Sequence, residues 1–176
     1  MTTIPNRYKL AKYEDVPENI RKLVDNIIES RKGIYIHGEC GTGKTHIAYA
    51  VYNHLIDNLK LKTKIKNLPD LLQYIKKDFD KENELMSNEN SYFNQIVNFN
   101  GLLIIDDIGT EKITEWVEET LYAIINKRYE EIYPTIFTSN LNLSQLKTKY
   151  GDRIVSRIVG SCDIIELTGE DKRLTI

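Results

Sequence analysis

Short runs of consecutive apolar residues alternate along the chain with longer stretches in which apolar residues recur every three or four positions. Most of the short runs lack polar alternation, which is typical of strands buried on both faces of a sheet. The short runs predict strands over residues 33–37, 62–67, 102–105, 135–138 and 164–167. The longer stretches have helical periodicity and predict helices over residues 18–30, 47–59, 69–75, 114–129 and 153–159.

Strands that alternate with helices predict an α/β fold, with a parallel sheet covered by helices on both faces. Ligands in such folds bind at the carboxyl ends of the strands. The polar stretch at residues 81–90 predicts a mobile loop between two of these elements. A chain of 176 residues suffices for one domain with a substantial core.

Composition and charge exclude several functional classes. No apolar run reaches about 18 residues, which excludes a membrane span, and the first residues lack the apolar segment of a secretory signal. Cys40 and Cys162 form no CxxC pair, so we expect neither a zinc site nor a disulfide scaffold, and we expect a cytoplasmic protein. The net charge of −2 excludes a protein whose whole surface binds nucleic acid, but it leaves room for a local basic patch.

A complete phosphate-binding motif follows the first predicted strand and precedes a predicted helix. It matches G-x-x-x-x-G-K-[ST] and consists of Gly38, Glu39, Cys40, Gly41, Thr42, Gly43, Lys44 and Thr45. Its glycines let several backbone N–H groups converge on one anion, at the positive end of the helix dipole. We expect Lys44 to reach the β- and γ-phosphates and Thr45 to bind Mg²⁺. Cys40 is interpreted as a small side chain in the loop rather than a redox group.

Two further polar groups stand where apolar strands end. Asp106 closes the run 102–105, as in a Walker B motif, and would hold Mg²⁺, while Asp107 stands where a base can orient the attacking water. The alternative is an Asp-Asp turn that merely closes a buried strand. Asn140 follows the strand at 135–138, where it can touch the γ-phosphate or position the water, although asparagine there is also a common turn residue.

Three arginines are candidates for contact with the γ-phosphate. Arg153 and Arg157 are four residues apart and share one face of a predicted helix. They form either a solvated basic stripe or an arginine finger that reaches the nucleotide of a neighbouring subunit. Arg173 is a second candidate, acting on the nucleotide of its own subunit.

In this order, the motifs resemble those of AAA+ ATPases, and more narrowly those of the DnaC/DnaI family of bacterial replicative helicase loaders and the related IstB transposition helper ATPases. The combination of Gly-Lys-Thr-His, Ile-Asp-Asp and Pro-Thr-Ile-x-Thr-Ser-Asn is the most specific part. The similar stretches cover nearly the whole chain: residues 4–8, 41–46, 103–109, 126–129, 134–140 and 151–157.

The resemblance implies a three-layer P-loop NTPase with a parallel sheet in the order 5-1-4-3-2. It makes Asn140 sensor 1, Arg157 the arginine finger with Arg153 as runner-up, and Arg173 a residue like sensor 2. His46 belongs to the cofactor-binding motif. The implied cofactors are ATP and Mg²⁺. The implied partners are a replicative helicase, single-stranded DNA and further copies of the chain joined through the ATP interface.

The expected organisation is a single AAA+ domain over residues 1–176, with a linker and helix over 1–32 and the ATPase core over 33–176. Because the phosphate loop begins at Gly38, we expect neither the separate N-terminal domain usual in loaders nor a C-terminal lid domain. The alternatives are an IstB-like transposition helper and a non-enzymatic nucleotide-binding decoy of a host loader. A small-molecule P-loop kinase fits less well, because nothing resembles the arginines of its lid.

Two basic segments are candidates for DNA contact. Four lysines alternate with other residues and would share one face of a strand at the sheet edge: Lys60, Lys62, Lys64 and Lys66. Lysines on an edge strand also discourage aggregation between sheets. Lys76 and Lys77, with Tyr74 nearby, lie on the helix inserted before Asp106; they suit single strands, or form an ordinary amphipathic helix. Trp116 is expected in the core or at a subunit interface.

Overall fold

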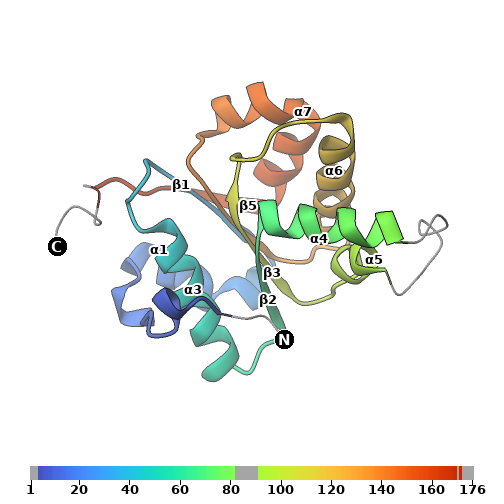
Figure 1. Ribbon diagram of the computed structural model, residues 1–176. Helices are drawn as coiled ribbons and strands as arrows, with labels where there is room; N and C mark the ends of the chain where they lie inside the picture. Colours follow the sequence, from blue (N-terminus) through green and yellow to red (C-terminus); the bar gives the residue numbers. More distant parts are fainter. Residues whose placement is uncertain (1–3, 82–90, 170, 172–176) are drawn as a thin grey trace.

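The computed structural model describes residues 4–81, 91–169 and 171. Its centre is a parallel sheet of five strands in the order β2-β3-β4-β1-β5, which confirms the predicted order read from the opposite edge (Figure 1). The strands are β1 (Gly33–His37), β2 (Thr63–Asn67), β3 (Leu102–Ile108), β4 (Thr135–Ser139) and β5 (Cys162–Glu166).

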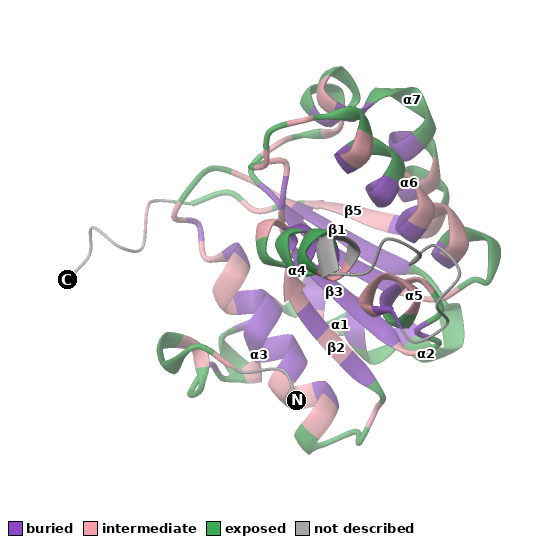
Figure 2. Cartoon of the chain, turned by 45° about the vertical axis from the view of Figure 1, so that its right-hand side comes forward, coloured by how far each residue is buried: buried purple, intermediate pink, exposed green. Residues whose placement is uncertain are grey.

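Helices cover both faces of the sheet. One face carries α1 (Glu18–Asp25), α2 (Ile27–Ser30) and α3 (Lys44–Asp57). The other carries α4 (Leu68–Lys81), α5 (Tyr92–Val97), α6 (Glu115–Glu130) and α7 (Leu143–Ser161). Figure 2 shows the buried sheet between these two layers. None of the helices in the described ranges is long and apolar enough to cross a bilayer.

Alternate residues of β3 explain why both faces are covered. Leu103 and Ile105 pack against the helices α4 to α7, whereas Leu102 and Ile104 pack against the side of α3. Successive side chains of a strand point to opposite faces, so an unbroken apolar run must be buried twice. The predicted parallel sheet with helices on both faces is therefore confirmed.

A buried arginine joins the amino-terminal ends of the central strands. Arg128 of α6 is only 2% exposed, and its guanidinium donates hydrogen bonds to Thr135 Oγ1 and to the backbone carbonyls of Phe99, Gly101 and Pro134. Burial lowers its pKa to about 10, so the group is still charged at neutral pH. One side chain thus connects α6 to the segments that enter β3 and β4.

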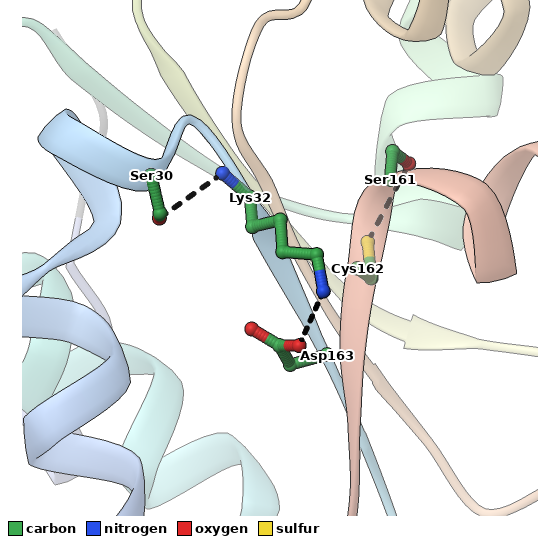
Figure 3. A network of polar contacts seen from close by, with 5 residues as sticks. All are labelled: Ser30, Lys32, Ser161, Cys162 and Asp163. Carbon is green, nitrogen blue, oxygen red and sulfur yellow. Dashed lines mark hydrogen bonds and ion pairs between the residues drawn. The ribbon is translucent and has the colours of Figure 1, made fainter.

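Strand β5 forms one edge of the sheet, and its residues contact the segment that enters β1 (Figure 3). The Lys32 backbone N–H donates to Ser30 Oγ at 3.2 Å, and Lys32 Nζ donates to Asp163 Oδ1 at 2.8 Å. Ser161 Oγ lies 3.7 Å from Cys162 Sγ at the start of β5. These contacts lie at the start of the pairing between β5 and β1, and β1 is the strand that leads into the phosphate loop.

The structure corrects several predicted boundaries. The helix expected over 18–30 divides at Asn26, whose φ and ψ of −92° and 0° are not helical. The last helix begins at Leu143 rather than Arg153, with a capping box formed by Asn142 and Gln145, and it bends where Gly151 has a φ of 77°. Its apolar periodicity is interrupted at this bend, so the sequence pattern predicts only the second half of the helix.

The structure differs from the predictions at four further places. Helix α5 is short and had no predicted counterpart, and β3 continues through the two aspartates to Ile108. The last strand spans Cys162–Glu166 rather than 164–167. Lys60 has a φ of 53° and lies before β2, so it does not share the face of the other lysines. The loop expected at 81–90 lies outside the described residues apart from Lys81, which ends α4.

Candidate nucleotide-binding site

The phosphate loop connects the carboxyl end of β1 to the amino end of α3. Gly41 and Gly43 have φ values of 85° and 97°, in the left-handed region that side chains with a Cβ rarely adopt. Gly43 is also the N-cap of α3, whose first helical residue is Lys44. The loop thus turns sharply and presents its backbone at the positive end of a 14-residue helix.

Lys44 lies within this loop and is 7% exposed. Its ammonium donates hydrogen bonds to the carbonyls of Gly38 at 2.8 Å and Glu39 at 2.5 Å, and lies 3.4 Å from Thr42 Oγ1. Thr42 in turn donates to the Glu39 carbonyl at 2.9 Å. These contacts keep a buried positive charge beside the loop that the motif assigns to phosphate.

A buried carboxylate stands beside the start of α3. Asp106 is 3% exposed, and its Oδ1 accepts a hydrogen bond of 2.6 Å from Thr138 Oγ1 on β4. Burial raises the pKa of Asp106, while hydrogen bonds from Thr138, Thr45 and Asn67 counteract this rise. A hydroxyl and a carboxylate are ligands that suit Mg²⁺.

These residues fit a magnesium ion that is held partly by nucleotide. The described residues contain no group of three His, Cys, Asp or Glu side chains that could hold a metal ion. Mg²⁺ commonly binds through one or two carboxylates together with substrate phosphates rather than in an all-protein cage. Thr45 and Asp106 would hold the ion on the protein side.

A bulge at the end of β3 sets the direction of Asp107. The pairing of β3 with β4 shifts between Ile105 and Ile108, and Asp107 has a φ of 63°. Its backbone N–H donates to Thr138 Oγ1 at 2.9 Å. In a regular strand the two aspartates would face opposite sides, but the bulge lets Asp107 line the same cavity as Thr138.

Eight of the predicted site residues line one cavity of about 780 Å³. Those that line it are Cys40, Gly41, Gly43, Lys44, Thr45, His46, Asp107 and Asn140. The cavity is also lined by Thr138, which holds Asp106 in place. The predicted loop residues Gly38, Glu39 and Thr42 stand behind this lining as hydrogen-bond partners of Lys44.

The N-terminal segment supplies lining residues that pattern analysis did not assign to the site: Arg7, Tyr8 and Asp15. The Tyr8 ring stacks on Tyr49 of α3 at 4.7 Å, and Asn53 donates a 3.4 Å hydrogen bond to the Tyr8 carbonyl. Asp15 lies 3.7 Å from His46 Nε2. Residues 4–8 carried part of the family resemblance, but only the folded chain places them beside α3.

The candidate arginines lie elsewhere. On α7, Arg157 lies over the Tyr129 ring at 4.9 Å and Arg153 over the Tyr122 ring at 4.1 Å. Neither lines the phosphate-loop cavity; Arg153 lines a separate cavity of about 440 Å³ beside three glutamates of α6. Arg173 lies outside the described residues.

The residues that were predicted to contact nucleic acid lie on the surface of α4. Lys76 and Lys77 are exposed, as is Tyr74 at 57%, and the intervening Ile75 is buried. Trp116 is partly buried and packs against the core of the α6 side.

A five-stranded parallel sheet in this order, with a phosphate loop after β1 and an acidic pair near the end of β3, defines the core of an AAA+ P-loop protein. The chain belongs to the family of IstB-like ATP-binding proteins, which matches residues 8–176. It is homologous to the DnaC/DnaI helicase loaders, which confirms the family resemblance.

Two curated relatives illustrate this homology. Identity is 26% over 178 residues with the replicative helicase loader DnaI of Bacillus subtilis. It is 30% over 138 residues with DnaC of Buchnera aphidicola subsp. Baizongia pistaciae. The alignments cover 94% and 78% of this chain but 54% of each relative, so the chain spans about half the length of the curated relatives it matches.

Solved structures confirm the fold. The DnaC helicase loader superposes with a TM-score of 0.80 at 24% identity, covering 93% of this chain and 100% of that one. DnaI gives 0.75 at 25% identity, with 97% and 94% covered. The initiator DnaA bound to AMPPCP and single-stranded DNA gives 0.76 at 23% identity, with 97% and 53% covered.

Proposed function

We propose that this chain is a Mg²⁺-dependent ATPase that acts in the cytoplasm as a helicase-loader-type factor of DNA replication and assembles on single-stranded DNA. The observation that carries the proposal is the buried Lys44 ammonium against the phosphate loop, together with the buried Asp106 carboxylate that Thr45, the next residue, contacts. The homologous DnaI and DnaC are replicative helicase loaders, which supports a role in replication. The similar DnaA structure holds AMPPCP and single-stranded DNA, which supports the binding of ATP and of single-stranded DNA.

Each residue of the cavity has a chemical role in this proposal. Mg²⁺, if bound, would neutralise the charge that develops on the phosphate oxygens. Lys44 and the loop N–H groups bind the triphosphate, and Thr45 and Asp106 hold the ion. Asp107 orients the attacking water and accepts its proton, and Asn140 fixes that water against the γ-phosphate.

The arginine finger comes from a neighbouring copy of the chain. Arg157 is absent from the lining of its own cavity, as a finger acting between subunits requires. ATP would therefore lie at the interface between copies, and hydrolysis would be weak until the protein is oligomeric and DNA-bound. Arg153, which also lies outside the cavity, is the second candidate for this role.

Nucleotide affinity tests the site directly. We expect Lys44→Ala to reduce the affinity for a fluorescent ATP analogue at least about tenfold, because a charge-assisted hydrogen bond contributes about 1.5–3 kcal/mol. Lys22→Ala, in which an exposed lysine of α1 changes, is the matched control. Equal affinity in the two variants would refute the assignment of the phosphate loop.

Partner capture separates the loader from a second candidate, a transposition helper, which the match to the IstB-like family favours. Full-length protein is incubated with ATP and either a replicative hexameric helicase or a transposase, and the mass of the complex is measured in solution. ATP-dependent association with the helicase supports the loader. Association with the transposase alone supports the helper.

A further inference from the structure

Three lysines form a row along the open edge of the sheet. Strand β2 is an edge strand with β3 on one side only (Figure 2). Lys64 and Lys66 belong to β2, and the Lys62 carbonyl extends the pairing by accepting a hydrogen bond from the Leu102 N–H at 3.0 Å. Residues two apart share one face of a strand, so the three side chains follow one another at intervals of about 6.6 Å.

Aromatic rings and neutral oxygens hold these lysines. The ammonium groups of Lys64 and Lys62 lie 4.3 and 5.3 Å from the centroid of the Phe99 ring, and that of Lys66 lies 5.6 Å from the Tyr92 ring. Lys62 also donates to Asn100 Oδ1 at 2.6 Å, and Lys64 to the Gln95 carbonyl at 3.4 Å. Contacts of this kind orient an ammonium group and leave its full positive charge in place.

The row carries uncompensated charge. Within residues 4–81, 91–169 and 171, none of the three lysines forms an ion pair with an acidic side chain. Burial, followed by the charges of Lys66, Lys62 and Arg128, lowers the pKa of Lys64. Mutual repulsion among these charges opposes folding. Protection of a sheet edge does not require lysines anchored over rings on one face.

An exposed aromatic ring lies at one end of the row. The Tyr92 ring beneath Lys66 lies 5.9 Å from the ring of Tyr74 on α4, which is 57% exposed. Regularly spaced cations that lead to an exposed ring are the two features that single-stranded nucleic acids require, namely phosphate contacts and a surface for base stacking.

We propose that Lys62, Lys64 and Lys66 bind successive phosphates of a single-stranded nucleic acid along the outer edge of β2, and that Tyr74 stacks on a base at the end of this row. The inference rests on the proposed function only for the identity of the strand as DNA. It adds a phosphate track on the sheet edge to the residues predicted on α4.

Anisotropy of a fluorescein-labelled oligothymidine tests the track over a range of salt concentrations. The triple variant Lys62→Gln/Lys64→Gln/Lys66→Gln is compared with Lys22→Gln/Lys127→Gln/Lys147→Gln, which removes the same charge from lysines paired with Glu18, Glu131 and Asp152. We expect the edge variant to bind at least about tenfold more weakly, with a slope of log K against log salt shallower by about 2, because each phosphate contact contributes about 0.7. The control keeps its slope.

Two further measurements distinguish failure of this inference from failure of the proposed function. Affinity for the ATP analogue and association with the helicase are measured on the same variants. Unchanged DNA affinity in the edge variant, equal losses in both variants, or no DNA binding by the unmodified protein each overturns the inference, whatever the helicase result. Aggregation of the edge variant with unchanged DNA affinity assigns the lysines to edge protection instead. Tyr74→Leu should weaken binding without changing the salt slope.

Discussion

Arg157 Nε donates a 3.0 Å hydrogen bond to Asn126 Oδ1 on the neighbouring helix α6. The same guanidinium lies over the Tyr129 ring at 4.9 Å, and Gly160 leaves room for that ring, since a Cβ there would stand 3.0 Å from Tyr129 Cε2. The guanidinium is thus oriented by a ring and an amide, and the described residues provide it with no ion-pair partner. Its orientation is fixed and its charge is not neutralised.

If Arg157 is the finger, Arg157→Ala will leave the affinity for the ATP analogue unchanged and reduce DNA-stimulated hydrolysis by a factor on the order of 10³–10⁵. Mixing this variant with Lys44→Ala should restore part of the activity, because some interfaces then combine an intact loop with an intact finger. Steady-state phosphate release measures both effects. Asn126→Ala should reduce kcat by a smaller factor, and it should not lower kcat further when Arg157→Ala is already present. Full stimulated activity in Arg157→Ala would contradict the assignment.

Asp106→Asn should stabilise the nucleotide-free protein while it abolishes Mg²⁺-dependent hydrolysis. Burial raises the pKa of Asp106, which means that the charged carboxylate is disfavoured in the folded state, and a neutral amide of the same shape removes that cost. Thermal unfolding without nucleotide should show a higher Tm, by about 2–4 °C for each kcal/mol gained. A lower Tm would show that the hydrogen bonds from Thr138 and its neighbours outweigh the burial cost.

Arg128→Met should lower the free energy of unfolding by about 3 kcal/mol or more, because it leaves buried carbonyl groups without donors. The acceptors at risk are the carbonyls of Phe99, Gly101 and Pro134. Lys127→Met, which breaks the exposed pair with Glu131, is the matched control and should lower the free energy of unfolding far less. Urea denaturation measures both, and similar losses would contradict the structural role of Arg128.

The two cysteines should report on the nucleotide site. Cys40 is exposed in the phosphate loop, whereas Cys162 is buried and its pKa is raised by that burial to about 12. A raised thiol pKa keeps the reactive thiolate scarce at every pH below it, so only Cys40 should react with a disulfide reagent in the native protein. ATP with Mg²⁺ should protect Cys40 and leave Cys162 unaffected until unfolding. Reaction of Cys40 at the same rate with and without nucleotide would place the ligand elsewhere.

Features formed by contiguous residues were predictable because the spacing of residues within one segment specifies them. The motif from Gly38 to Thr45 depends on glycine freedom and on a helix that starts at a fixed offset, and both are local properties. Apolar runs such as 102–105 likewise show that a strand is buried on both faces. These signals suffice for the sheet and the phosphate loop.

Relationships between distant segments were not predictable in this way. The bulge that turns Asp107 toward the cavity, the packing of Tyr8 against Tyr49 and the hydrogen bond from Arg157 to Asn126 each join elements far apart in the sequence. The alternation of lysines between residues 60 and 66 likewise did not reveal the rings beneath them.

The amino-acid sequence by itself determined the chemistry of this protein: a phosphate loop, an acidic pair and a parallel sheet, each set by neighbours within a few residues. Tertiary structure alone decided which side chains meet, because the strand order brings the ends of β1, β3 and β4 together and packs α6 against α7. Contact across a fold depends on packing between elements, and no local pattern of hydrophobic positions specifies that packing.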